Sequence, residues 1–179
     1  MGDPADHLRI VAKITRHLRG GGLEPVLVGG MALVVLGSRR VTRDFDFVVA
    51  DPGNRLHSVV DVFYGHGLEL VSRFDEGGNV TATLANRRVA SIRLRLDAPA
   101  SASFFSVSTG LRIDLLFDFP VPAADLVAHA TRLTIRGQSL LMASEEDLLR
   151  LKRTAAAARS VPGDADDIAF LESRKRGRR

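Results

Sequence analysis

Two apolar runs joined by a glycine turn constrain the fold more than any other feature of the sequence. The run "EPVLV" predicts a short buried strand, and Gly29 and Gly30 follow it directly. The segment "GGMALVVLG" predicts a turn into an apolar helix that ends at Gly37. The run "DFDFVVA" then predicts a second buried strand. The sequence therefore indicates a strand, a helix and a strand, with Asp44 and Asp46 in the second strand.

The two aspartates need a physical explanation. Side chains alternate between the faces of a strand, so Asp44 and Asp46 share one face while Phe45 and Phe47 point into the opposite layer. Two carboxylates this close repel each other unless a cation lies between them. Magnesium is commonly held by one or two carboxylates together with substrate phosphates. The pair predicts a metal site, and the exposed face of an edge strand is the alternative.

The glycine pair adds a second element of a site. Bare backbone at Gly29 and Gly30 would let an anion approach the first amides of the following helix. A tight turn that needs small residues is the alternative, since neither GxxxxGK[ST] nor GxGxxG is present. Only thirteen residues separate Gly30 from Asp44. We therefore expect the phosphate seat and the metal ligands to face one crevice.

A third carboxylate is expected in the run "LRIDLLFDF". Asp114 lies between Ile113 and Leu115 in a strand too apolar to be solvated, so its charge needs a partner. Asp118 has the same parity, but it lies before Pro120 at the exit of the strand, where a turn aspartate is ordinary. We prefer Asp114. Three aspartates could hold a second metal that activates an attacking hydroxyl for displacement at phosphorus.

The remaining elements predict an α/β fold with a mixed sheet in one domain, residues 1–179. An N-terminal helix is expected within residues 1–22, and C-terminal helices within 144–173, the first capped by Ser144. Between them we expect another helix in "PGNRLHSVVDVFYGHG", a short helix in "PAADLVAHA" and a hairpin around Gly137 in "RLTIRGQSLLMA". Strands are predicted in "LELVSRF", "NVTATLA", "RVASIRLRL" and "LRIDLLFDFP".

Composition narrows the class of protein. The chain has 179 residues, of which 45% are hydrophobic, so it can bury one substantial core. It has no cysteine, which excludes disulfides and thiolate metal sites and fits a cytoplasmic protein. No apolar stretch reaches the roughly twenty residues of a membrane span, so a membrane partner is not expected. The net charge of +4 comes mostly from arginine, which suits phosphate but is also an ordinary surface cation. Residues 174–179 are expected to form a disordered basic tail, with contact to nucleic acid as the alternative.

These motifs resemble a known superfamily. "VGG", thirteen residues, "DFDF" and a later "IDLL" resemble the nucleotidyltransferases of DNA polymerase beta type. More narrowly, the order of motifs over about residues 23–172 resembles the small bacterial nucleotidyltransferases of the abortive-infection, AbiEii-like toxin group. That group shows R-x-T-x-D-x-D and a late lysine followed by an aspartate-bearing helix. The matching residues are Arg40, Thr42, Asp44 and Asp46, and then Lys152, Asp164 and Asp167.

The resemblance implies a mixed-sheet nucleotidyltransferase fold and a reaction. A nucleoside monophosphate would pass from an NTP, such as ATP, to an acceptor hydroxyl, and pyrophosphate would be released. The implied roles are phosphate binding by Gly29 and Gly30, binding of Mg²⁺ or Mn²⁺ by Asp44 and Asp46, a metal or base position at Asp114, phosphate clamps at Arg40 and Arg43, and a triphosphate or structural contact at Lys152.

Partners follow from the same resemblance. The acceptor would be RNA, a protein or a small molecule such as an aminoglycoside, and a cognate antitoxin or a second copy of the chain would be the macromolecular partner. Two other functions stay open at this point. The chain could keep the fold as an interaction protein without turnover, whose signature would be the loss of an aspartate. It could also be a nucleic-acid-binding module that uses its arginines and its basic tail, with a steep dependence of binding on salt.

Overall fold

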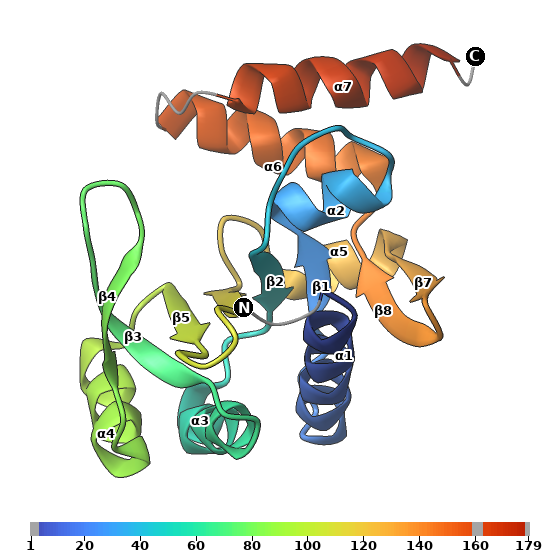
Figure 1. The fold of residues 1–179 in the computed structure, drawn as a ribbon. Coiled ribbons are helices and arrows are strands. Elements are labelled where there is room, and N and C mark those ends of the chain that lie inside the picture. The colour runs from blue at the N-terminus through green and yellow to red at the C-terminus, as the bar shows by residue number, and fades with distance from the viewer. Residues whose placement is uncertain (1–3, 159–162, 178–179) are drawn as a thin grey trace.

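The structure is a computed structural model that describes residues 4–158 and 163–177 (Figure 1). The described residues form one mixed sheet with helices on both of its faces. The strands are β1 Val26–Val28, β2 Phe45–Val49, β3 Glu69–Phe74, β4 Val80–Leu84, β5 Ser101–Phe105, β6 Arg112–Phe117, β7 Thr131–Ile135 and β8 Gln138–Met142. The helices are α1 Pro4–Gly20, α2 Gly29–Val35, η1 Gly53–Arg55, α3 Leu56–Gly65, α4 Arg87–Asp97, α5 Ala123–His129, α6 Glu145–Ala158 and α7 Asp164–Gly177.

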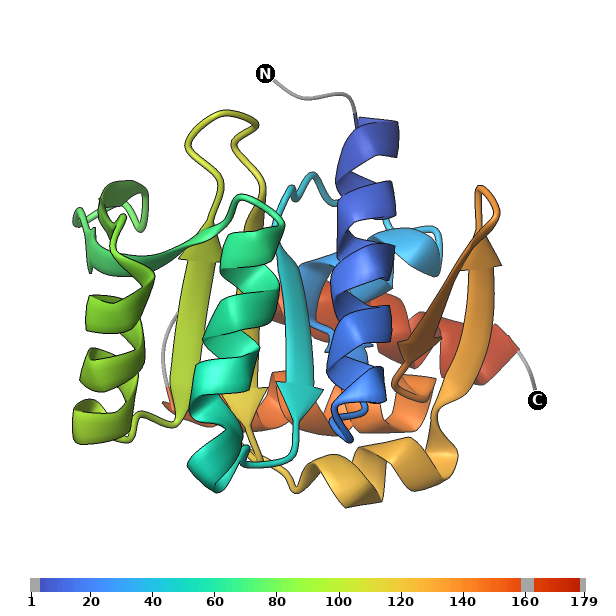
Figure 2. The same cartoon turned by 90° about the horizontal axis from the view of Figure 1, so that it is seen from below.

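The eight strands described follow the order β4-β3-β5-β6-β2-β1-β8-β7. Two pairs are parallel, β2 with β6 and β1 with β8, and the other neighbours are antiparallel. The sheet is mixed because both helices and hairpins connect its strands, so the predicted α/β fold class with a mixed sheet is confirmed. In Figure 1, α1, α3 and α4 lie below the sheet, whereas α2, α6 and α7 lie above it. Figure 2 shows the lower helices side by side across the face of the sheet.

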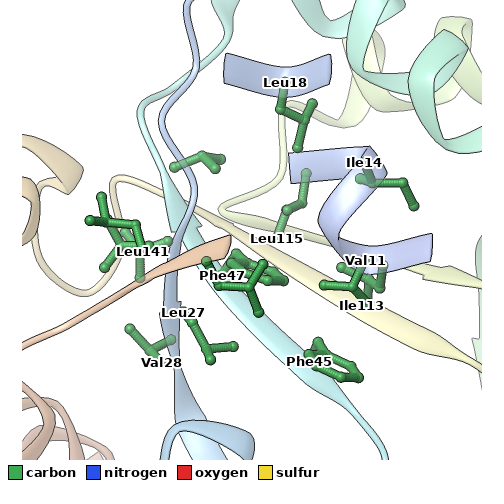
Figure 3. Close-up of a cluster of buried hydrophobic side chains, with 14 of the residues drawn as sticks. Val11, Ile14, Leu18, Leu27, Val28, Phe45, Phe47, Ile113, Leu115 and Leu141 are labelled. Carbon is green, nitrogen blue, oxygen red and sulfur yellow. The ribbon is translucent and has the colours of Figure 1, made fainter. Parts of the chain in front are cut away.

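The core lies between α1 and the centre of the sheet (Figure 3). The predicted apolar stripe of α1 buries Val11, Ile14 and Leu18 against this face. On the sheet side, the buried neighbours are the odd-numbered residues of β2 and β6, with Leu27 of β1 beside them. Burial of these side chains fixes the register of β2 and β6, since a slip by one residue would turn the apolar set away from α1. The opposite face of the same strands is left for the site.

One strand prediction is wrong. The segment "RVASIRLRL" forms helix α4, although its alternation of isoleucine or leucine with arginine is typical of a strand. The Asn86 side chain accepts hydrogen bonds from two amides of the first turn, which caps the helix. Ala90 and Leu94, four positions apart, are buried, whereas Ile92 and Leu96 are exposed. The burial therefore has the period of a helix, and the alternation of residue types does not correspond to two faces.

Strand β5 was not predicted at all. Its sequence "SASFF" contains three small residues, which give a weak strand signal, yet it pairs with both β3 and β6. The other predicted elements are confirmed, including the hairpin around Gly137, which has a positive φ of 76°. The Ser144 hydroxyl accepts from the amide of Asp147 and donates to its carboxylate, as the predicted cap of α6 requires. In the part of the chain described, no helix is long and apolar enough to cross a membrane.

The prediction of a disordered tail from residue 174 is also wrong. Helix α7 continues to Gly177, where its last basic residues suit the negative end of the helix dipole. Arg174 forms an ion pair with Glu145 of α6 at 2.9 Å and donates to the carbonyl of Leu36 at 2.9 Å. These contacts tie the end of α7 to α6 and to the end of α2. Residues 178–179 of the predicted tail lie outside the described residues.

Candidate active site

A cleft of about 510 Å³ lies between the sheet and α6. Seven of the eight predicted site residues line it, which are Gly29, Gly30, Arg40, Asp44, Asp46, Asp114 and Lys152. Arg43 instead lines a separate, mostly apolar cavity near the start of α1. The structure therefore brings the glycine pair, the three aspartates and two cations to one place, although they come from four distant segments of the sequence.

The aspartates meet because β2 and β6 are parallel and in a fixed register. Asp46 of β2 lies directly beside Asp114 of β6, and Asp44 directly precedes β2. The flanking apolar residues of both strands are buried toward α1, so their alternation turns the carboxylates to the cleft. Asp118, the alternative to Asp114, accepts hydrogen bonds from the amides of Asp51 and Ala123 and so holds a turn.

The crowding of negative charge changes the acidity of the site. The pKa of Asp46 is raised to about 6, mainly by burial and then by the nearby charges of Asp114 and Asp44, while Arg112 and Lys152 oppose the rise. Burial also raises the pKa of Asp44, while the guanidinium of Arg112 opposes that rise. The folded protein therefore bears a cost when these carboxylates ionise, which a bound cation would relieve.

Gly29 leaves the room that the Asp46 carboxylate needs. Its φ is +68°, and a Cβ placed there would lie 2.0 Å from Asp46 Oδ2 and 2.9 Å from Asp46 Cβ. A side chain at residue 29 would thus overlap the aspartate from its carboxylate to its first carbon. At Gly30 a Cβ would lie 2.8 Å from Nε of Arg40, a group at the end of a flexible side chain. Glycine is therefore required much more strictly at residue 29 than at residue 30.

Arg112 is a site residue that the sequence reasoning missed. Its Nη2 lies 2.6 Å from Asp44 Oδ2, and its Nε lies 3.3 Å from Asp114 Oδ2. Both arginine and aspartate belong to β6 and are two residues apart, so they share the face that borders the cleft. The alternation in "LRIDLL" that indicated Asp114 also placed Arg112 on its face. Ser101 and Ser103 of β5 line the cleft as well. They were missed because β5 itself was not predicted.

The two predicted cations of the cleft are paired with α7. Nη1 of Arg40 lies 2.5 Å from Asp167 Oδ2, and Nζ of Lys152 lies 2.6 Å from the same oxygen. Lys152 also lies 3.3 Å from Asp164 Oδ1. All but Arg40 are buried or nearly so, so water and salt screen this cluster less than an exposed pair. The late lysine and the aspartate-bearing helix are thus one ionic cluster at the rim of the cleft.

The donor atoms of the site suit a divalent cation, but the side chains are not arranged around a metal position. Its donors are carboxylate oxygens, the ligands that Mg²⁺ prefers, and Asp114 Oδ1 is buried with no hydrogen-bond partner. Among the residues described, however, no group of three His, Cys, Asp or Glu side chains is arranged to hold a metal ion. The guanidinium of Arg112 stands between two of the three aspartates. The metal-binding roles of Asp44, Asp46 and Asp114 stay predictions.

Comparison with known proteins shows the fold. No family model and no curated protein matches the sequence. Among solved structures, an antigenic nucleotidyltransferase-like protein from Paracoccidioides brasiliensis is similar with a TM-score of 0.56 at 17% identity, over 92% of this chain and 74% of that chain. The lincosamide antibiotic adenylyltransferase LnuA, in its lincomycin-bound structure, has a TM-score of 0.56 at 14% identity, over 92% and 96%. The antibiotic-resistance factor ANT(2'')-Ia has a TM-score of 0.55 at 12% identity, over 98% and 94%. The chain therefore has the nucleotidyltransferase fold.

A matched pair of substitutions tests the contact between Gly29 and Asp46. We expect Gly29→Ala to lower the free energy of unfolding by about 1–3 kcal/mol, because it combines a strained φ with overlap on Asp46. Gly30→Ala should cost less than about 1 kcal/mol, since the end of the Arg40 side chain can move. Urea denaturation of both variants measures the difference. Equal costs would contradict the packing described for residue 29.

A second prediction concerns the raised pKa of Asp46. Because the folded protein binds this proton more tightly than the unfolded chain, wild type should lose stability as pH rises from about 4 to 6. In metal-free buffer above pH 6, Asp46→Asn should be more stable than wild type by on the order of 2 kcal/mol, and the gain should vanish near pH 4. Chemical denaturation across pH measures it, with Asp125→Asn, an exposed residue outside the cleft, as the control. A gain that does not depend on pH would contradict the assignment.

Proposed function

We propose that the protein is a nucleotidyltransferase that moves a nucleoside monophosphate from an NTP to an acceptor hydroxyl and releases pyrophosphate. The observation that carries the proposal is the parallel register of β2 and β6, which sets Asp46 beside Asp114 in a cleft that Gly29 and Gly30 also line. The nucleotidyltransferase fold supports it. Carboxylates, a glycine turn and cations in one cleft are the groups that phosphoryl transfer uses.

Each group has a proposed task. Mg²⁺ or Mn²⁺ held by Asp44 and Asp46 would supply positive charge for the triphosphate and the departing pyrophosphate. Gly29 and Gly30 would let the β and γ phosphates approach the backbone. The acceptor oxygen would attack the α-phosphorus, and the bond from that phosphorus to the β-phosphate oxygen would break. Asp114 would take the metal or base position, and as the base its Oδ1, which has no hydrogen-bond partner, would accept the proton of the acceptor hydroxyl.

The cations have different standings in this proposal. Lys152 and Arg40 line the cleft and also pair with Asp167 of α7. We propose that both cations contact the triphosphate from the side that faces the cleft. Asp167 orients both cations at the rim of the cleft, where the triphosphate would meet them. Arg43 lines the other cavity, and its role as a phosphate clamp stays a prediction without support from the cleft.

A small molecule is the acceptor that the comparisons favour. The proteins similar to this chain over nearly their full lengths include an adenylyltransferase for lincosamide antibiotics and an antibiotic-resistance factor. We therefore propose a hydroxyl of a small polar molecule, with ATP as the first donor to test. RNA or protein as the acceptor, an AbiEii-like toxin role, an antitoxin or a second copy as a partner, and a cytoplasmic location stay predictions from the sequence.

Two observations support the nucleotidyltransferase proposal over the alternative functions. An interaction protein without turnover was expected to lack an aspartate, whereas all three aspartates line the cleft. A nucleic-acid-binding module was expected to use the arginines and the basic tail, whereas Arg174 of that tail is helical and paired with Glu145. The arginines of the cleft are likewise paired with carboxylates. Nucleotidyl transfer gives a role to the three aspartates and to the arginines paired with carboxylates in the cleft.

Transfer of label tests the function. We expect the purified protein with Mg²⁺ or Mn²⁺ and α-labelled NTPs to label a low-molecular-weight hydroxyl compound from a panel that includes lincosamides and aminoglycosides. Asp44→Asn and Asp46→Asn should each lower the rate by at least about a hundredfold, because each removes a carboxylate from the proposed metal site. Thin-layer chromatography and mass spectrometry of the acceptor measure the transfer.

The controls separate the acceptor from the reaction. Asp125→Asn makes the same chemical change on an exposed residue outside the cleft and should keep wild-type activity. Labelled RNA or protein in cell extract, with no labelled small molecule, would redirect the acceptor and keep the reaction. Failure of every NTP to bind at millimolar metal, measured by calorimetry, would overturn the proposed function.

A further inference from the structure

Arg112 occupies the space between two of the proposed metal ligands. Its guanidinium lies 2.6 Å from Asp44 Oδ2 and 3.3 Å from Asp114 Oδ2, so one cation bridges carboxylates from two strands. We propose that Arg112 is an internal cation that holds these aspartates in the metal-free protein and must leave them before a divalent cation can bind to them. The proposal rests on the proposed function, because it concerns the cation that nucleotidyl transfer would use.

The hairpin of β3 and β4 holds the guanidinium in this place. Nη1 of Arg112 donates to the carbonyl of Gly78, in the turn of the hairpin, at 3.1 Å. The guanidinium carbon lies 5.7 Å from the centre of the Phe74 ring at the end of β3, within the range of a cation–π contact. Two carboxylates, one carbonyl and one ring thus surround the group on several sides. Arg112 is positioned by its surroundings and is not a surface side chain that falls on the aspartates by chance.

A metal ion and the guanidinium would compete for the same oxygen atoms. Asp44 Oδ2 and Asp114 Oδ2 face Arg112, and a divalent cation between these residues would need the same two oxygen atoms as ligands. The described residues contain no ready group of three metal-binding side chains, in agreement with a site that is closed by another cation. The side chain of Asp46, in contrast, makes no hydrogen bond or ion pair with the side chain of any other described residue. The aspartate free of Arg112 is therefore the one where a cation can first bind.

The arrangement links metal binding to the hairpin. Three aspartates without a cation would repel one another, and Arg112 supplies the compensating charge before any metal arrives. Movement of Phe74 or Gly78 away from the guanidinium would weaken its hold on the carboxylates and favour the metal. Loading of the metal would in turn release the hairpin from its contact with Arg112. The hairpin therefore becomes a positioning element for the site, although its residues carry no catalytic group.

Titration of the protein with Mn²⁺ by calorimetry tests the proposal without any measurement of activity. Arg112→Gln should bind Mn²⁺ about tenfold more tightly than wild type, because one charge-assisted competitor is gone. Phe74→Ala keeps the charge of Arg112 and removes only its ring support, so it should tighten binding by about two- to threefold. Arg132→Gln removes an exposed positive charge outside the cleft and should leave the affinity unchanged.

Each other outcome contradicts the proposal in a different way. Equal or weaker binding by Arg112→Gln would overturn the competition while leaving the proposed function in place. Tighter binding by Arg112→Gln with no change in Phe74→Ala would assign the effect to lost charge and overturn the displacement. Absence of Mn²⁺ binding by all proteins at millimolar metal would overturn the proposal and the metal-dependent function together. If Arg112→Gln does not fold, Phe74→Ala carries the test, and an unchanged affinity overturns the proposal.

Discussion

The site depends on the parallel pairing of β2 with β6, because this register sets Asp46 beside Asp114. Burial of the apolar residues between them against α1 fixes the register, so the core and the site are two faces of the same strands. The cost is the burial of Asp46 beside two other carboxylates, which raises its pKa to about 6. Gly29, which has no side chain, leaves space for the Asp46 carboxylate, and the guanidinium of Arg112 compensates the charge of Asp44.

The same principle explains why the C-terminal helices belong to the site. Helix α6 brings Lys152 to the cleft, and α7 brings Asp164 and Asp167 to Lys152 and Arg40. A positive side chain beside three aspartates would be pulled toward them, and the aspartates of α7 hold it at the rim instead. The cleft therefore contains two ionic layers, one that Arg112 forms on the sheet and one that Lys152 forms below α7. Substrate phosphates would meet the second layer, and the metal ion would displace Arg112 from the first.

Sequence reasoning found what depends on local pattern. The glycine pair, the aspartates of β2 and Asp114 were identified because alternation and apolar flanks are local signals, and the structure brings these residues together. The parallel register of β2 and β6 could not be found this way, since it depends on contacts between segments far apart in the chain. Arg112 was readable from its parity with Asp114, but its support by Phe74 and Gly78 comes from a distant hairpin. Helix α4 was mistaken for a strand because alternating residue types imitated two faces.

A crystal structure of the protein with Mg²⁺ and a non-hydrolysable ATP analogue would show whether the cleft binds the nucleotide as proposed. We expect a triphosphate over Gly29 and Gly30, with the ion between it and the carboxylates of Asp44 and Asp46. We also expect the α-phosphorus to face Asp114. A nucleotide bound elsewhere, for example in the apolar cavity beside Arg43, with Arg112 still the only cation on the aspartates, would rule out this site.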